Sequence, residues 1–195
     1  MTETHKPVKT PSADGLAAAA GEAAKKGPPP VHLWDPPFCG DLDIEIRRDG
    51  TWFYLGTPIG REPLVKLFAS ILKREGDDYF LVTPVEKVGI RVVDAPFVAV
   101  DAEAVGAGEA QSLRFRTNVG DEVTAGPEHP IRISFDASGE PSPYIHIRRG
   151  LEALIDRKTF YRLVDLAQSG KHGKEDWLGL WSEHRFFPII PMAEL

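Results

Sequence analysis

The chain carries one pattern of strands and a helix twice, and this repetition constrains its fold more than any other feature of the sequence. The first copy begins at Ile44 and the second at Ile131, and each predicts a strand, a turn, a second strand, a loop and a helix. The two copies align when Ile59 is placed on Ile155. Boundaries between like halves are common places for a ligand. The predicted fold is α+β, with two domains built on a duplicated strand–strand–helix–strand motif, mostly antiparallel sheets, and a small open barrel as the second domain.

Composition disfavours several classes of function. The 195 residues, 42% of them hydrophobic, suffice for one large or two small cores. The formal net charge of -6 disfavours duplex DNA and anionic membranes as partners, so an anionic ligand would need a local cluster of cations. The single cysteine, Cys39, cannot form an intramolecular disulfide, and no segment approaches the ~20 apolar residues that cross a bilayer. These features predict a cytoplasmic protein without a membrane segment.

Glycine, proline and charge divide the chain into three parts. Residues 1–30 are predicted to be a flexible N-terminal tail, because their Ala-rich run is interrupted by glycine and charge and is too short for a secretory signal. Residues 31–88 form the first predicted domain, and Trp34 and Phe38 are expected to anchor its apolar first segment. Residues 89–195 form the second, enlarged predicted domain.

Local signals place the elements within these parts. The pair Asp49-Gly50 predicts a two-residue hairpin turn between the first two strands. Apolar residues at helical spacing predict helices over residues 61–75 and 156–168. Five short segments between turn signals predict an antiparallel sheet or a small open barrel, and they cover residues 79–83, 89–93, 97–103, 112–118 and 122–125.

Arginines on one strand face form the best candidate for a binding site. Alternation along the predicted strand places Arg114, Arg116 and Asn118 on the same face. Two neighbouring guanidinium groups repel each other unless an anion lies between them, and their planar forks suit phosphate. The alternative is a structural network, in which Asp121, Glu122 or carboxylates of another strand pair with the arginines.

A second polar face is predicted at Tyr144, His146 and Arg148, which alternate with apolar residues. The repeat also places Arg61 and Arg157 at matching positions, where they could hold a ligand or support the start of each helix. An aromatic side chain could stack on a nucleobase. The candidate ligand-binding residues are Arg61, Arg114, Arg116, Asn118, His146, Arg148 and Trp52.

Motifs for catalysis are missing from the sequence. The six histidines lack the spacing of a zinc site, and no nucleophile elbow accompanies the serines, so no metal, cofactor or catalytic residue is predicted. An enzyme remains an alternative hypothesis. A hydrolase or transferase would use His129 or His146 as general base beside a carboxylate such as Asp94 or Glu128.

Four segments resemble a family of uncharacterised proteobacterial proteins known only as a domain of unknown function. The segments are residues 32–68, 82–90, 92–101 and 113–123, and the resemblance extends over Val31–Ile190. It implies a duplicated two-domain α+β fold, a second half loosely like the pleckstrin-homology barrel, and a ligand site between the domains. It provides no catalytic residues.

Three hypotheses for function follow. The first is a non-enzymatic cytoplasmic ligand-binding protein, with a role in signal transduction, whose arginines and aromatic residues hold a phosphorylated, nucleotide-like or nucleic-acid-derived ligand. The second is a protein–protein interaction module without a small ligand. The third is the hydrolase or transferase. The first is preferred because the arginines follow a pattern along the strands and the histidines do not.

Overall fold

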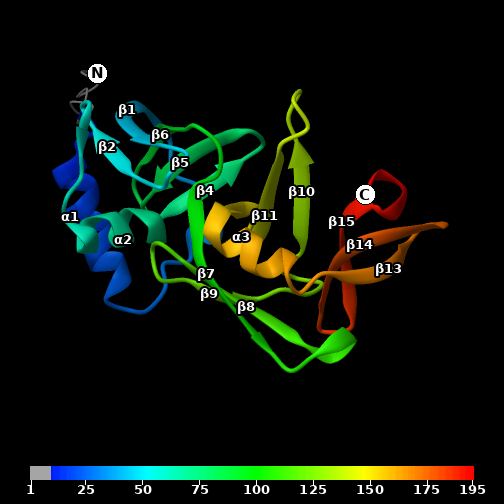
Figure 1. Ribbon diagram of the computed structural model, residues 1–195. Coiled ribbons are helices and arrows are strands. Elements are labelled where there is room, and N and C mark those ends of the chain that lie inside the picture. The colour runs from blue at the N-terminus through cyan, green and yellow to red at the C-terminus, as the bar shows by residue number, and fades with distance from the viewer. Residues whose placement is uncertain (1–9) are drawn as a thin grey trace, which may run out of the picture. The chain divides into compact units, whose positions relative to one another are not determined.

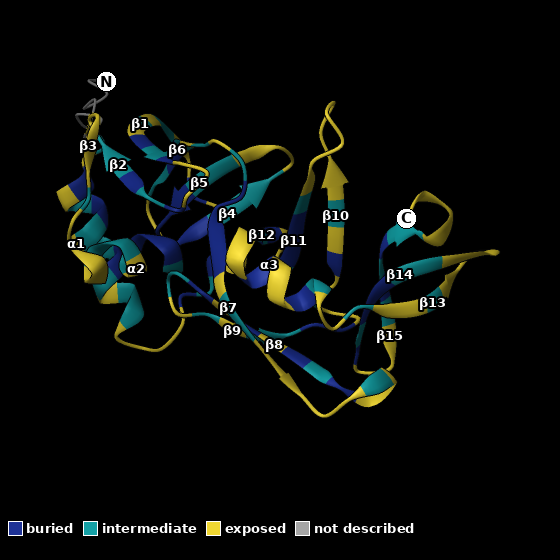
Figure 2. Cartoon of the chain, in the orientation of Figure 1, coloured by how far each residue is buried: buried dark blue, intermediate teal, exposed yellow. Residues whose placement is uncertain are grey.

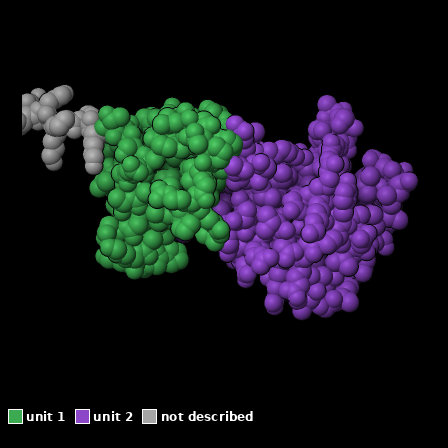
Figure 3. Space-filling model, turned by 60° about the vertical axis from the view of Figure 1, so that its left-hand side comes forward, with its two compact units in different colours: residues 1–45, 52–91 green, residues 46–51, 92–195 purple. Residues whose placement is uncertain are grey.

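The computed structural model describes residues 10–195, which form two compact units (Figure 3). One unit holds the described residues up to Glu45 together with Trp52–Arg91. The other holds Ile46–Thr51 together with Val92–Leu195. The turn between the first two strands therefore belongs to the second unit, although the strands on either side of it belong to the first.

Sheet A is the centre of the first unit (Figure 1). Its six strands lie in the order β3-β2-β1-β6-β5-β4. The elements are η1 (Val31–Leu33), β1 (Phe38–Ile46), β2 (Trp52–Tyr54), β3 (Thr57–Pro58), α2 (Glu62–Ser70), β4 (Leu72–Glu75), β5 (Asp78–Val82) and β6 (Lys87–Val92). Trp52 and Phe68 stack within the core of this unit, with ring centroids 6.3 Å apart.

The second unit holds two sheets. Sheet B has the order β10-β11-β12-β7-β8-β9 and curls into a half barrel, and sheet C has the order β13-β14-β15. All the pairs in both sheets are antiparallel except β12 with β7. The strands before the helix are β7 (Phe97–Val105), β8 (Ser112–Thr117), β9 (Glu122–Thr124), β10 (Ile131–Phe135), β11 (Pro141–Arg148) and β12 (Leu151–Ile155). They are followed by α3 (Arg157–Val164), β13 (Gln168–His172), β14 (Glu175–Ser182) and β15 (Arg185–Pro191), while η2 (Gly108–Ala110) precedes β8 and η3 (Met192–Glu194) ends the chain. The predicted α+β class is confirmed.

The predicted repeat corresponds to a longer unit than the sequence indicated. Three strands, a helix and three strands occur first as β1–β3, α2 and β4–β6, and again as β10–β12, α3 and β13–β15. In the first copy β1 pairs with β6, and in the second copy the corresponding β10 lies beside β15. Strands β7–β9 have no counterpart in the first copy. They extend the sheet of the second copy, because β7 pairs with β12.

The first turn of both copies has the same hydrogen bonds. In the first copy Gly50 N–H donates to Arg47 O over 2.9 Å, and in the second Gly139 N–H donates to Asp136 O over 3.0 Å. Both glycines have positive φ, +84° and +81°. The predicted two-residue turn at Asp49-Gly50 is wrong, because both primed turn types need positive φ at the first central residue, and Asp49 does not have it. In each copy the loop has three residues, and the last of them is a glycine in the left-handed region of backbone conformation.

The N-terminal segment differs from the predicted flexible tail. Ala13–Ala24 form helix α1, whose N-cap Ser12 accepts a hydrogen bond from Gly15 N–H. The helix packs beside α2 (Figure 2). Leu16 and Ala20 of α1 are fully buried. Alanine has the highest intrinsic helix propensity, so a few buried contacts suffice to fix this segment. Residues 1–9 of the predicted tail lie outside the described residues.

Both predicted helices end earlier than expected. Helix α2 ends at Ser70 and is followed by β4, because Leu72 and Leu81 pair across the next hairpin. Helix α3 ends at Val164, before β13. The N-cap of α2 is Arg61, whereas the N-cap of α3 is Asp156, so the aligned arginines of the two copies are offset by one position.

Candidate functional site: a charged face on sheet B

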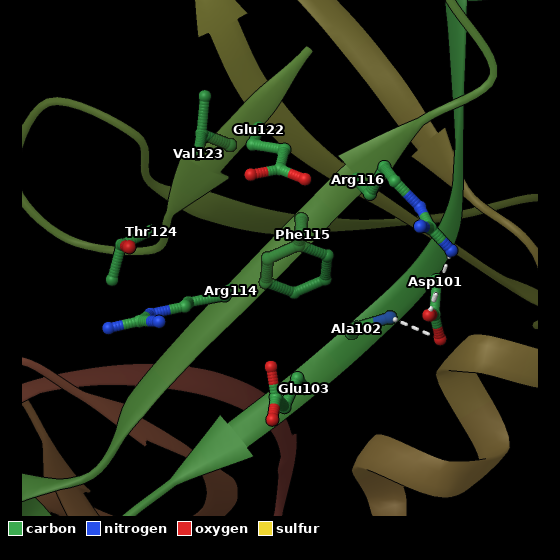
Figure 4. A pocket seen from close by; sticks show the side chains of 9 residues that line it. All are labelled: Asp101, Ala102, Glu103, Arg114, Phe115, Arg116, Glu122, Val123 and Thr124. Carbon is green, nitrogen blue, oxygen red and sulfur yellow. Dashed lines mark hydrogen bonds and ion pairs between the residues drawn. The ribbon is translucent and has the colours of Figure 1, made fainter. Parts of the chain in front are cut away.

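Strands β7, β8 and β9 carry a charged face that borders a hollow of about 480 Å³ (Figure 4). Along β8, Leu113, Phe115 and Thr117 are buried while Arg114 and Arg116 are exposed, as the alternation predicts. The residues that form this face, called here the charged face, are Asp101, Glu103, Arg114, Arg116, Glu122 and Thr124.

Register places opposite charges across from each other on the charged face. Arg116 lies opposite Asp101 on β7 and Glu122 on β9, and Arg114 lies opposite Glu103 and Thr124. A β-bulge between Ala99 and Asp101 shifts the register of β7 by one residue. Without this shift, Asp101 and Glu103 would point to the buried side of the sheet, because side chains alternate along a strand.

Asp101 joins two arginines. It pairs with Arg116 over 3.3 Å and with Arg162 of α3 over 2.6 Å. The hydrogen bond from Arg162 is the main reason that the pKa of Asp101 is lowered from its ordinary value. The carboxylate therefore stays charged at neutral pH. Arg116 is therefore paired with a carboxylate of another strand, which is the structural network given above as the alternative to a binding site.

Arg114 differs from its neighbour. Within the described residues its guanidinium group has no hydrogen bond and no ion pair, and the side chain extends along the sheet away from Arg116 (Figure 4). Asn118, predicted on the same face, has a structural role instead. It receives a hydrogen bond from Val98 N–H over 3.0 Å and donates one to Gly50 O over 3.3 Å.

His146 is held by backbone groups at both ring nitrogens. Its Nε2 accepts a hydrogen bond from Gly150 N–H over 3.0 Å, so Nδ1 carries the proton and donates to Glu128 O over 2.8 Å. His129 stacks beside it, with ring centroids 6.0 Å apart, and its Nδ1 donates to His146 O. Neither imidazole is bonded to a carboxylate in the described part of the chain, which removes the support for a general base at this pair.

The prediction that Arg148 shares a face with His146 is wrong. His146 lies opposite Glu152, but Arg148 lies opposite Leu151, because a bulge interrupts the register between them. Neighbouring residues on β12 point to opposite faces, so Arg148 is displaced to the side of the buried residues. There it pairs with Asp121 over 2.5 Å, and its guanidinium carbon lies 4.9 Å from the centroid of the Phe97 ring.

Two candidate residues lie in the first unit. Trp52 is 1% exposed, so its indole ring cannot stack on a ligand without opening the core. Arg61 is exposed at the start of α2. The other candidates lie in the second unit. A common site for all of them stays a prediction.

A polar network that the sequence did not indicate lies on β10, β11 and β12. Tyr144 Oη donates to Asp94 over 2.8 Å, and Asp94 also pairs with Arg48. Arg132 lies over the Tyr144 ring, 4.2 Å from its centroid, and forms two hydrogen bonds with Glu152. Burial raises the pKa of the Tyr144 hydroxyl, and the hydrogen bond to Asp94 raises it further. Asp94 is thus occupied and does not assist a histidine.

The sequence analysis missed Asp101 and Glu103 on the charged face, and it missed Arg162 of α3, which pairs with Asp101. Alternation shows that Asp101 and Glu103 share a face, because one residue separates them. A regular strand would, however, place that face on the buried side with Ala99. The bulge in β7 and the approach of α3 could not be read from the sequence, because both depend on tertiary packing.

Residues 10–195 contain no group of three His, Cys, Asp or Glu side chains placed to bind a metal ion. In the same part of the chain, every helix is too short or too polar to cross a membrane.

Two family models match the chain. The model described as "Domain of unknown function (DUF1285), N-terminal domain" matches residues 29–95. The model described as "Protein of unknown function (DUF1285), C-terminal domain" matches residues 96–189. Among curated proteins, none matches the chain.

Two solved structures are similar to this one. A DUF1285 family protein from Silicibacter pomeroyi DSS-3 has 61% sequence identity and a TM-score of 0.84, and the match covers 94% of this chain and 98% of that one. A DUF1285 family protein from Shewanella baltica OS155 has 34% identity and a TM-score of 0.50, with 64% of this chain and 91% of that one covered.

Proposed function

The chain belongs to the DUF1285 family, and we propose that it is a non-enzymatic binding protein that adds an extended segment of a partner protein to strand β9. The observation that carries the proposal is the position of β9 at the end of sheet B, directly beside the hollow of the charged face. A terminal strand offers unpaired backbone groups to a second chain, and side-chain pockets beside it supply specificity.

Two residues of β9 direct their backbone amide and carbonyl groups away from β8. The residues that flank β9 bond to β8: Ala125 N–H donates to Leu113 O, and Asp121 O accepts a hydrogen bond from Thr117 N–H. Backbone groups alternate in direction along a strand, so those of Val123 also point to β8. The amides and carbonyls of Glu122 and Thr124 therefore point away from the sheet, where an added strand would pair with them.

Charge on the face supports a protein segment more than a polyanion. The charged face contains two arginines and three carboxylates, which alternate across the strands. A peptide of mixed charge can match such an arrangement, while a phosphate would meet carboxylates beside each arginine. Bacterial signal transduction in the cytoplasm is the proposed setting for such an interaction.

A library of displayed peptides of about seven residues, selected on the immobilised protein, tests the proposal. We expect extended peptides whose binding is abolished by Thr124→Pro, because proline removes the outward amide and leaves the bonds to β8 intact. Thr124→Ala is the matched control, since it removes the hydroxyl and keeps the amide. The proposal fails if no peptide is enriched, or if Thr124→Pro binds the selected peptides as well as Thr124→Ala does.

A phosphate-bearing small ligand is the second candidate, and it is favoured by the guanidinium of Arg114, which has no partner within residues 10–195. A bound nucleotide or sugar phosphate would raise the melting temperature by mass action. We expect Arg114→Ala to abolish this rise, Arg114→Lys to retain part of it, and Arg47→Ala to leave it unchanged, because lysine keeps the charge and loses the planar fork. Equal shifts in the parent protein and Arg114→Ala would exclude this candidate.

A further inference from the structure

The outer face of sheet A has a gap in its row of charged side chains. Along β6, Lys87 and Arg91 project to the same face as Gly89, because they are two residues away on either side. Lys87 pairs with Glu75 over 2.9 Å, and Arg91 pairs with Glu45. The central position, Gly89, has no side chain.

Asp41 of β1 lies over this gap. A Cβ atom on Gly89 would stand 2.1 Å from Asp41 Oδ1, so the carboxylate occupies the space that a side chain at residue 89 would need. Within the described residues, the Asp41 carboxylate has no hydrogen bond and no ion pair. Lys87 and Arg91 each form an ion pair with a carboxylate, whereas the Asp41 carboxylate pairs with no cation among the described residues.

Aromatic rings border the same space. Phe38 is 55% exposed, which differs from its predicted role as an anchor, and its ring lies 3.7 Å from the Cβ position of Gly89. Phe38 and Asp41 are three residues apart and would point to opposite faces of a regular strand. Gly40, with φ of +100°, lies between them and redirects the chain, so both side chains reach the gap. Phe80 contacts Phe38 edge to face, with ring centroids 6.1 Å apart.

The hollow enclosed by these residues has a volume of about 350 Å³. Its unneutralised charges are negative, because Asp41 and Asp78 line it and Lys87, the one cation among the described residues that line it, is already paired with Glu75. The Lys87 ammonium lies 4.9 Å from the Phe80 ring centroid, so one aromatic ring of the hollow already contacts a cation.

We propose that this hollow binds an alkylguanidinium or alkylammonium group, either of a small molecule or of an arginine or lysine side chain. The Asp41 carboxylate accepts hydrogen bonds from the cation, and the ring of Phe38 packs against its apolar stem and charged head. Gly89 provides the floor of the site, since any larger residue would fill it. This inference is independent of the function proposed for β9.

Titration of the ¹⁵N-labelled full chain at low salt tests the site, with butylguanidinium in one series and a capped Gly-Arg-Gly peptide in another. We expect saturable shifts of the Gly89 and Phe80 amides. Asp41→Asn should weaken binding at least about tenfold, because a charge-assisted hydrogen bond is lost. Asp43→Asn is the matched control, because it removes an exposed carboxylate from the same strand outside the hollow. Phe38→Leu should weaken binding about threefold, because the cation–π contact is lost.

The two series distinguish the sources of the cation. Saturation by butylguanidinium alone indicates a small-molecule ligand, and saturation by the peptide indicates an arginine of a partner protein. The proposal is overturned if neither probe saturates, if Asp41→Asn binds as the parent does, or if Asp43→Asn weakens binding as much as Asp41→Asn. Thermal melting of each variant measures whether the fold is retained. We expect Asp41→Asn to melt as the parent does, because Asp41 is exposed and has no partner among the described residues.

Discussion

The two copies of the repeat begin with the same turn, yet they build different structures around it. The first copy closes into one sheet through the pairing of β1 with β6. The second copy is divided between sheets B and C, and three additional strands, β7–β9, extend it at β12. The charged face lies on these additional strands. The comparison indicates that the repeat supplies the scaffold, while the proposed binding function belongs to the part that the repeat lacks.

The turn glycines provide the largest expected difference between the copies. At Gly50 a Cβ atom would lie 2.7 Å from Asn118 Nδ2 and 3.0 Å from Val98 Cγ2, whereas at Gly139 nothing lies within 4 Å. We expect Gly50→Ala to cost about 3 kcal/mol of unfolding free energy, from positive φ and from the clash. Gly139→Ala should cost about 1 kcal/mol, from φ alone. Equal costs in chemical denaturation would show that the surroundings of the two turns do not differ.

Helix α1 is the second difference, because it packs against α2 in the first unit and α3 has no such partner helix in the second. Leu16 is fully buried on α1. Leu16→Ala should lower the free energy of unfolding by about 2 kcal/mol, through lost burial and a residual cavity. Leu33→Ala, at a position 72% exposed, is the control and should change it little. A neutral Leu16→Ala would mean that α1 is detached in solution.

The N-caps of α2 and α3 give a smaller expected difference in stability between the two copies. Asp156 accepts a hydrogen bond from Thr159 N–H over 2.7 Å, while Arg61 makes no side-chain cap. We expect Asp156→Ala to reduce stability by about 1 kcal/mol. Arg61→Ala should have no such effect, and Arg61→Asp should stabilise α2 by supplying the missing cap. Thermal melts of the three variants measure these changes in stability. Equal melting temperatures for Asp156→Ala and Arg61→Ala would contradict the prediction.

Acid titration of the two turns has the smallest expected effect. The amide and hydroxyl of Thr51 lower the pKa of Asp49 from its ordinary value, and the hydroxyl of Ser138 and the amides that follow lower the pKa of Asp136. A lowered pKa in the folded state means that the stabilisation is present above the ordinary pKa and is lost as pH falls through the folded-state value. Carboxyl NMR should show that both groups titrate below the ordinary pKa of an aspartate. A normal pKa at either residue would exclude the hydrogen bonds of that turn.

Sequence patterns predicted the local elements well and their partners poorly. The strand at Arg114 follows from alternation, and the position of the turn at Gly50, though not its length, follows from the backbone freedom of glycine; both are properties of short segments. The end of α2 was misplaced because Leu72 continues the helical spacing, although it pairs with Leu81 in a hairpin. The partner of Arg116 was missed because a bulge sets which face Asp101 occupies. Such choices are made by packing between distant segments.

Hydrogen exchange at β9 tests the central claim, that the additional strands bind a partner segment by strand addition. In the free protein the Val123 amide should exchange slowly, because it points to β8, while the Glu122 and Thr124 amides should exchange rapidly. With a selected peptide bound, we expect the Glu122 and Thr124 amides to become protected and Val123 to remain so. Unchanged exchange at Glu122 and Thr124 in the saturated complex would contradict the claim.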